Sequence, residues 1–192
     1  MRFAQLLFLI FLVHFSNSIN AQEPVSIHLT EKDGLPDIEF YSMKEDSKGF
    51  IWFASDKGLH RYDGKSFKQF SHPNKKGRSL FNLKLDPKGN IWCNNIAGQF
   101  FYVNSEELVL FKDYQKELKG QLADYSFFKN NLLIRKMNTI FCVDIDTKKI
   151  EKTIVNVGTT NIGIPLTNQY LFINESNHIV LLDSLFKTSS FP

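Results

Sequence analysis

The sequence contains very little cysteine, which limits the chemistry open to it. Cys93 and Cys142 are its only cysteines, and no Cys-x-x-Cys pair occurs. Neither a redox pair nor a zinc knuckle is therefore indicated. Both cysteines lie in apolar, strand-like patterns, where cysteine usually acts as a small buried hydrophobe. A disulfide between them is the alternative, and the sequence leaves it open because it does not give the distance between their α-carbons.

Net charge and long apolar runs are also scarce. The chain has 23 basic and 20 acidic residues. This near-balance produces no field that would attract nucleic acid or an anionic surface, so we expect no nucleic-acid partner. After residue 21, no apolar run reaches the roughly 20 residues that a membrane helix needs. The mature chain is therefore expected to contain no membrane segment.

Residues 1–21 are typical of a secretory signal peptide. Arg2 is their only charge, an apolar run extends from Leu6 to Phe15, and a polar stretch ends at Ala21. This order of basic start, short apolar middle and small residue predicts cleavage after Ala21. An uncleaved anchor is the alternative, but the apolar run is only about ten residues long. We expect a periplasmic, extracytoplasmic location after cleavage.

A motif recurs at a distance of forty residues. Residues 46–52, Asp-Ser-Lys-Gly-Phe-Ile-Trp, match residues 86–92, Asp-Pro-Lys-Gly-Asn-Ile-Trp, at five of seven positions. The same spacing aligns Gly58 with Gly98 and Tyr62 with Tyr102, and one inserted residue then aligns Phe70 with Phe111. Weaker copies over residues 129–144 and 168–183 keep the apolar pattern and the turns without the tryptophan. A fixed period of this length indicates a repeat architecture.

Within each copy, short apolar segments alternate with Gly, Asp and Asn turns. Four antiparallel strands in about 40 residues are typical of a β-propeller blade. The 19 Phe and 6 Tyr also favour sheet. The sequence therefore predicts an all-β fold with about four four-stranded antiparallel blades of a larger or incomplete β-propeller. We expect the blades at approximately residues 38–70, 79–111, 125–154 and 160–188, after an N-terminal strand and lead-in over residues 22–37.

One tripeptide, Gly64-Lys65-Ser66, resembles the end of a phosphate-binding loop. Such a loop needs a first glycine five positions earlier and a helix after the serine. Residue 59 is Leu59, and residues 67–70 have a strand pattern. A tight turn between two strands is therefore the better interpretation, and we expect no nucleotide cofactor.

The recurring tryptophans and aspartates allow a binding and a structural interpretation. Trp52 and Trp92 could stack on a ligand, but their identical place in two copies favours packing between neighbouring blades, because a ligand site rarely repeats in every blade. Asp46, Asp86 and Asp63 could be acid–base groups or calcium ligands. Their Gly and Lys-Gly neighbours favour turn capping instead, and no D-x-D-x-D spacing exists.

The histidines form no recognisable catalytic or metal pattern. They are His14, His28, His60, His72 and His178. None of them has the spacing of a metal pair on a helix or a neighbouring nucleophile. We therefore assign no catalytic, cofactor-binding or metal-binding residue and expect no cofactor.

Two connecting segments interrupt the repeat. The basic stretch His72–Arg78 joins the first two copies, and we interpret it as a solvated linker rather than a polyanion site. The charged stretch Lys112–Leu122 precedes the third copy and could include a helical turn. Loops that interrupt a regular array often carry binding, so this insertion is the strongest candidate for a functional decoration.

The motifs as a group resemble the two-component regulator propeller family. The resemblance is carried by residues 29–36, 46–53 and 56–64, read as LTEKDGLP, DSKGFIWF and DKGLHRYDG. It implies an extracytoplasmic sensor region of a membrane-bound sensor histidine kinase, especially of the Bacteroidetes type. In that family a β-sandwich, a transmembrane helix and a cytoplasmic kinase follow the propeller, and no such segment is present here.

The expected function is therefore non-catalytic ligand sensing in a two-component system. The resemblance implies a ligand, carbohydrate-like for the family, together with the rest of a sensor kinase and a homodimer as partners; membrane anchoring follows if the chain is part of a longer sensor. The alternative is a stand-alone or truncated exported β-propeller that acts as a protein-interaction module. An unpaired edge would favour association. An enzyme ranks last, because no nucleophile–base set or paired carboxylates occur at matched positions.

Overall fold

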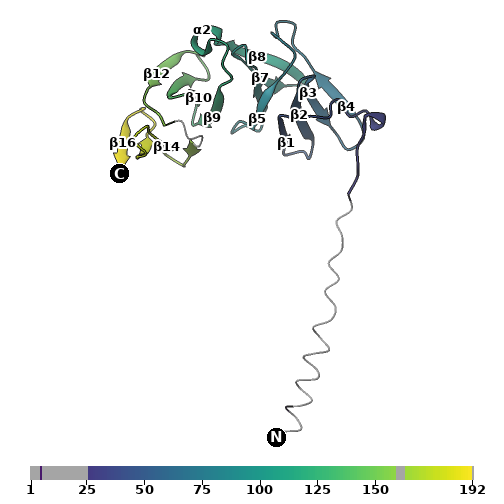
Figure 1. Ribbon diagram of the computed structural model, residues 1–192, viewed down its shortest axis with the longest axis horizontal. Coiled ribbons are helices and arrows are strands. Elements are labelled where there is room, and N and C mark those ends of the chain that lie inside the picture. Colours follow the sequence, from purple (N-terminus) through teal and green to yellow (C-terminus); the bar gives the residue numbers. More distant parts are fainter. Residues whose placement is uncertain (1–4, 6–25, 159–162, 192) are drawn as a thin grey trace.

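The computed structural model describes residue 5 and residues 26–158 and 163–191. Its regular structure is four antiparallel four-stranded sheets. Figure 1 shows the sheets side by side in an arc, with the first sheet at one end and the last at the other. The all-β propeller prediction is therefore confirmed. The predicted signal peptide lies outside the described residues except for residue 5 and stays a prediction.

Each sheet is one sequence copy, and we number these sheets blade 1 to blade 4. Blade 1 contains β1 (Ser42–Glu45), β2 (Ile51–Ser55), β3 (Gly58–Tyr62) and β4 (Phe67–Phe70). Blade 2 contains β5 (Phe81–Leu85), β6 (Ile91–Asn94), β7 (Gln99–Asn104) and β8 (Glu107–Asp113). Blade 3 contains β9 (Asp124–Phe128), β10 (Asn131–Lys136), β11 (Thr139–Asp144) and β12 (Ile150–Ile154). Blade 4 contains β13 (Ile164–Pro165), β14 (Tyr170–Ile173), β15 (Ile179–Leu182) and β16 (Thr188–Phe191).

Two strands extend beyond their predicted ends. β8 continues past residue 111 because Asp113 still pairs with Gln99, and β16 continues past residue 188 because Phe191 pairs with Ile179. Two short helices complete the described secondary structure: the 3-10 helix η1 (Glu31–Asp33) and the α-helix α2 (Gln115–Leu118). Within the described ranges, no helix has the length and hydropathy needed to cross a membrane.

The phosphate-loop-like tripeptide forms a tight turn, as the repeat predicts. Gly64 has a φ of 94°, a left-handed conformation that glycine adopts without steric cost. The Asp63 carboxylate accepts hydrogen bonds from the backbone N–H of Lys65 at 2.8 Å and of Ser66 at 2.7 Å. Strand β4, not a helix, follows. The turn therefore lacks the helix N-terminus that a phosphate would need.

The core consists of three layers, one between each pair of neighbouring blades. Trp52 and Cys93 belong to the layer between blades 1 and 2, Trp92 to the layer between blades 2 and 3, and Cys142 to the layer between blades 3 and 4. Both cysteines are free and buried, as small hydrophobes would be. Burial raises the pKa of each thiol to about 12, so neither is a reactive thiolate near neutral pH.

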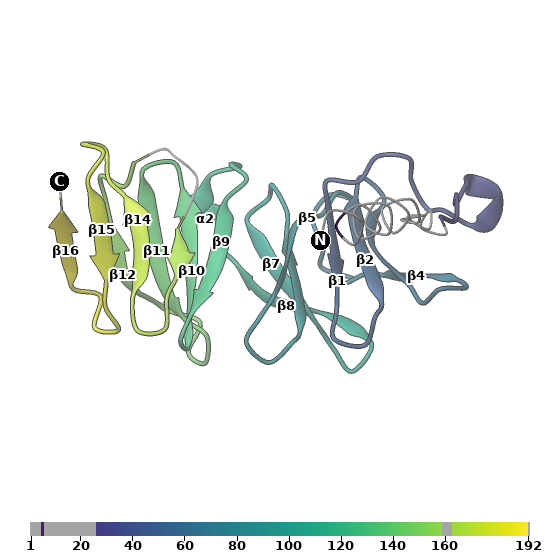
Figure 2. The same ribbon diagram turned by 90° about the horizontal axis from the view of Figure 1, so that it is seen from below.

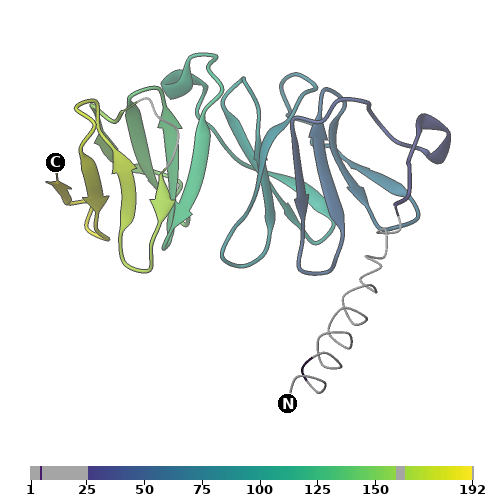
Figure 3. The same cartoon turned by 60° about the horizontal axis from the view of Figure 1, so that its bottom comes forward.

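The two ends of the arc differ in what covers their outer sheet faces. At blade 1, the chain before β1 crosses the outer face: the Phe40 and Phe53 rings lie 4.8 Å apart, and the Gly34 α-carbon faces the ring of Phe67. In Figures 2 and 3, η1 lies beyond blade 1 at that end, whereas no described element lies beyond blade 4. Among the described residues, the outer face of blade 1 is therefore covered, and none covers the outer face of blade 4.

Candidate functional site

The recurring aspartates cap turns and anchor the tryptophans. Asp46 accepts hydrogen bonds from the backbone of Lys48 and Phe50, and its second oxygen accepts the Trp52 Nε1–H at 2.8 Å. In blade 2, the Asp86 carboxylate accepts the Trp92 Nε1–H at 2.9 Å. The turn-capping prediction is confirmed, and the indole contact is an additional role that the sequence did not predict.

The two tryptophans have matching surroundings, as the packing interpretation requires. Each is 3% exposed. The Trp52 ring lies 4.9 Å from that of Phe70, and the Trp92 ring lies 4.9 Å from that of Phe111. Both tryptophans therefore fill the layer toward the next blade rather than offering an exposed stacking surface.

The histidines do not converge. His60 is 6% exposed, and its Nδ1 has no hydrogen-bond partner among the described residues. Burial, followed by the positive charge of Lys57, lowers the pKa of His60, while Asp37 opposes this shift. The His72 Nδ1 accepts the backbone N–H of Asn74 in a turn. His14 lies outside the described residues, and the part of the chain that the structure describes holds no group of three or more potential metal ligands.

The insertion before blade 3 packs into the core. It includes the single turn of α2, and its Tyr114 and Leu118 are 2% and 0% exposed in the layer between blades 2 and 3. Burial raises the pKa of Tyr114 well above its ordinary value, so its hydroxyl stays protonated at physiological pH. The segment Lys112–Leu122 thus has a packing role that its charged sequence did not indicate.

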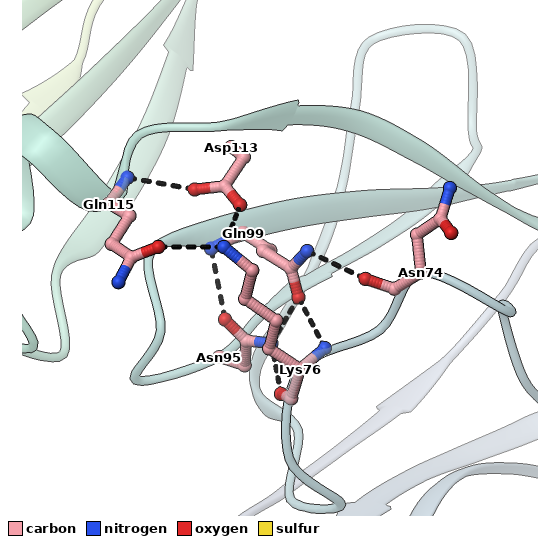
Figure 4. A network of polar contacts seen from close by, with 6 residues as sticks. All are labelled: Asn74, Lys76, Asn95, Gln99, Asp113 and Gln115. Atoms are coloured by element: carbon pink, nitrogen blue, oxygen red, sulfur yellow. Dashed lines mark hydrogen bonds and ion pairs between the residues drawn. The ribbon is translucent and has the colours of Figure 1, made fainter.

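The basic linker between blades 1 and 2 is held by a polar network (Figure 4). The buried Gln99 side chain accepts the Lys76 backbone N–H at 2.7 Å and donates to the Asn74 carbonyl at 2.9 Å. Asn95 donates to the Lys76 carbonyl, and the Lys76 ammonium lies 2.8 Å from the Asp113 carboxylate. The network fixes the linker against blade 2, in agreement with its interpretation as a connection.

A groove opens between blades 1 and 2 at the opposite end of the strands. It has a volume of about 230 Å³ and is lined by the β1–β2 and β5–β6 turns, the β7–β8 turn and the inward-facing ends of β2 and β3. Arg61 of β3 is one of its lining residues. We call this hollow the Arg61 groove.

Arg61 lies directly across from Trp52 in the sheet and is flanked by aromatic rings. Its guanidinium carbon is 4.4 Å from the centre of the Phe50 ring, 5.4 Å from Trp52 and 5.5 Å from Phe70. Only 14% of the side chain is exposed, and its Nε–H is buried without an acceptor among the described residues. A cation held over aromatic faces is stabilised by their quadrupoles, but its hydrogen-bonding capacity is only partly used.

The counter-charge comes from blade 2. Glu106, in the β7–β8 turn, places one oxygen 2.5 Å from Arg61 Nη1 and the other 2.7 Å from Lys68 Nζ. Hydrogen bonds from Arg61 and Lys68 lower the pKa of Glu106 to about 2, so it is a carboxylate at physiological pH. Its side chain is 53% exposed. The pair therefore bridges two blades at the mouth of the groove.

The alignment of the first two copies hid the difference between Arg61 and Tyr102. It placed the one extra residue of the second copy after Tyr102, whereas the structure has it in the β6–β7 turn. In blade 1, Ser55 pairs with Gly58 across a two-residue turn, whereas in blade 2 Asn95 and Gln99 close a three-residue turn. Trp52 consequently opposes Arg61, and Trp92 opposes Tyr102. The predicted correspondence of Tyr62 with Tyr102 is wrong, because one extra residue exchanges the faces of a strand.

Solved structures with similar folds include lyases and sensor domains. Virginiamycin B lyase from Staphylococcus aureus aligns with a TM-score of 0.56 and 16% identity over 81% of this chain and 56% of that chain. A protein described as the extracellular domain of a hybrid two component system from B. thetaiotaomicron aligns with a TM-score of 0.54 and 15% identity over 80% of this chain and 22% of that chain. A second such domain from the same organism aligns at 0.51 and 16%, over 88% and 23%.

These likenesses show a shared propeller fold and no more, since every identity is low. The chain spans about half the length of the lyase and less than a quarter of the two sensor domains. No curated protein matches the chain. Residues 34–57, which include β1 and β2, match the profile of a family described as two component regulator propeller. Residues 34–57 are therefore similar to the repeat of the two-component regulator propeller family.

Proposed function

We propose that this chain is an extracytoplasmic, ligand-sensing propeller segment of a membrane-bound two-component sensor histidine kinase. The observation that carries the proposal is the family match over residues 34–57, at the residues where blade 1 begins. The likeness to extracellular domains of hybrid two component systems supports the same location. The family resemblance adds an expectation of a carbohydrate-like ligand.

Sensing would act through the packing of blades rather than through catalysis. The Arg61 groove lies at a junction between two blades, and its mouth is bridged by a half-exposed ion pair. A ligand that binds one arrangement of the blades better than another shifts the population toward it. In a receptor dimer, that shift would be passed to the kinase. We propose no reaction for the chain itself, and the likeness to a lyase, at 16% identity, concerns the fold alone.

Reading the gene beyond codon 192 tests this proposal at low cost. We expect the reading frame to continue into a β-sandwich, a membrane helix and a kinase. A stop codon directly after Pro192 in an intact locus would contradict the proposal. A reporter driven by the reconstituted sensor would then identify the ligand.

A second candidate function, self-association, is favoured by the open face of blade 4. Its strand register places six apolar side chains on the side away from blade 3: Ile164, Leu171, Ile173, Ile179, Leu181 and Phe191. Ile164, Ile179 and Phe191 are 45%, 44% and 49% exposed. In blades 1 to 3 the corresponding face is covered by the next blade. An uncovered apolar sheet face favours association.

We infer a second copy of the chain as the occupant of this face. A head-to-tail contact would require the outer face of blade 1, which the preceding chain already covers through Phe40. A two-fold contact of blade 4 with blade 4 needs no other surface, because such an interface is self-complementary. Light scattering of the purified chain should give the mass of a dimer, and Ile179→Lys should give a monomer. Met137→Lys, at an exposed residue of a blade 3 turn, is the matched control and should leave the dimer intact. A wild-type monomer at all concentrations would contradict this inference.

A further inference from the structure

We propose that the Arg61 groove binds a small organic carboxylate and that Glu106 occupies its place when no ligand is bound. This inference deepens the proposed function, because it names the class of ligand that the groove would sense. It concerns a charged site of blade 1 that the repeat itself does not require.

A cross-strand row in blade 1 is unusually basic. Strand pairing places Lys44, Trp52, Arg61 and Lys68 opposite one another across all four strands, on the face toward blade 2. The corresponding row of blade 2 is Lys84, Trp92, Tyr102 and Val109. Three of the four positions are therefore cationic in blade 1 and one in blade 2. The cations of blade 1 therefore surround Trp52, which has the same position in its row as Trp92 has in blade 2.

Packing alone does not explain the arginine. In blade 2, Tyr102 stacks on Trp92 with ring centres 5.2 Å apart, so a neutral ring is sufficient at this position. The blade 2 lysine of the row has a carboxylate of its own, because Lys84 pairs with the half-exposed Asp124 of blade 3 at 2.7 Å. Arg61 and Lys68 instead share the single carboxylate of Glu106. Arg61 and Lys68 together carry two positive charges, and Glu106 neutralises one of them.

The position of Glu106 in its turn indicates that its side chain can rotate away from Arg61 and Lys68. It lies in a two-residue hairpin turn between Asn104 and Glu107, and both turn residues, Ser105 and Glu106, have a positive φ, of 48° and 68°. Such turns favour Asn-Gly, and other residues adopt them at a cost. Because half of its side chain is in solvent, Glu106 can rotate away without exposing the core.

The geometry of the groove favours a carboxylate over a larger anion. Glu106 is itself a carboxylate, and it already places its two oxygens on two different cations. The guanidinium has further N–H groups that can form the paired contacts typical of arginine and carboxylate. A volume of about 230 Å³ suits a molecule of roughly one ring, and the half-buried Phe50 and Val103 provide apolar lining. The expected ligand therefore joins one carboxylate to a compact, flat body.

Calorimetric titration of the purified chain with benzoate tests this site, with benzamide as the neutral match. We expect benzoate to bind, benzamide not to bind, and added salt to weaken the benzoate affinity. Glu106→Gln removes the competing carboxylate and should tighten benzoate binding about tenfold, on the scale of one displaced charged contact. Glu107→Gln, at the first residue of β8 and outside the ion pair, should leave the affinity unchanged.

Arg61→Tyr is the informative loss variant, because blade 2 folds with tyrosine at this position. It should remain folded and lose benzoate binding. Arg61→Lys, which keeps the charge but not the planar fork, should bind more weakly than wild type. Equal benzoate binding by wild type and Arg61→Tyr, or no binding by either wild type or Glu106→Gln, would overturn the proposal. Benzoate binding without any signalling output would refute the sensing function and leave the anion site intact.

Discussion

The first two blades and the last two reach the same four-stranded sheet with different side chains. Blades 1 and 2 place an indole toward the next blade and fix it through an aspartate, whereas Leu133 and Leu171 occupy the corresponding strand positions in blades 3 and 4. Leu133 is still 1% exposed, so an aliphatic side chain closes that layer equally well. The comparison shows that the fold depends on the alternation of apolar residues and on turn chemistry. The Asp–Trp pair is one means of satisfying both.

Removing an indole should produce the largest effect. Trp92→Ala would delete a side chain packed against Tyr102, Phe111 and Phe127. We expect the free energy of unfolding to fall by about 3–5 kcal/mol, as for other buried aromatic truncations. Leu171→Ala, at the matching position on the open face, should cost about 1 kcal/mol because its side chain is only partly buried. Urea denaturation measures both. Equal losses would show that the face of blade 4 is buried in solution.

Removing a hydrogen-bond acceptor from a turn should produce the next largest loss of unfolding free energy. Asp86 accepts the backbone N–H of Lys88 and Asn90 as well as the Trp92 indole N–H, so Asp86→Ala should cost about 2–3 kcal/mol. Asn174 of blade 4 accepts two backbone N–H groups and no indole, and Asn174→Ala should cost about 1 kcal/mol. Thermal unfolding of the two variants gives the comparison. A smaller loss for Asp86→Ala would mean that the indole contact contributes nothing.

The covered end of blade 1 should respond to pH. Burial lowers the pKa of His60 below its ordinary value of 6.5, so the unfolded chain binds the proton first as pH falls. Unfolding free energy should be unaffected well above pH 6.5 and should decrease as pH falls below it. His60→Phe copies Phe101, which lies opposite Cys93 as His60 lies opposite Phe53, and should reduce this dependence. Urea midpoints across pH 5 to 8 provide the measurement, and an unchanged slope in the variant would contradict the assignment.

The exposed half of the inter-blade ion pair should matter least for stability. Lys68 and Glu106 are 48% and 53% exposed, and such pairs contribute about 0–1 kcal/mol. Lys68→Met should therefore change the unfolding free energy by no more than that amount, and less at high salt. A larger loss would indicate that the pair holds blades 1 and 2 together and is not free to open.

Much of the architecture follows from the printed sequence. The forty-residue spacing of the two strong and two weaker copies predicts the four blades, and the Gly, Asp and Asn turns predict the antiparallel strands within each. The buried state of Trp52 and Trp92 also follows, because both occupy the same place in two copies. These features are local, so turn and strand preferences suffice to determine them.

The candidate site could not be predicted in the same way. Arg61 and Glu106 are far apart in sequence and meet only because two blades stack. The chemical contrast between Arg61 and Tyr102 depends on where the extra residue falls, and either position fits the spacing equally well. The covering of blade 1 by Phe40 likewise depends on the path of the preceding chain.

The three-residue turn at Asn95–Gln99 has a wider consequence for how such arrays diversify. Neighbouring side chains on a strand point to opposite faces of the sheet. Gaining or losing one residue in a hairpin turn therefore moves each side chain of the following strand to the opposite face. A length change in a tip can thus replace a neutral ring with a cation at a junction while the sheet itself survives. Insertions and deletions in hairpin turns can therefore change the ligand specificity of a propeller in one step, whereas point substitutions in the strands change one side chain at a time.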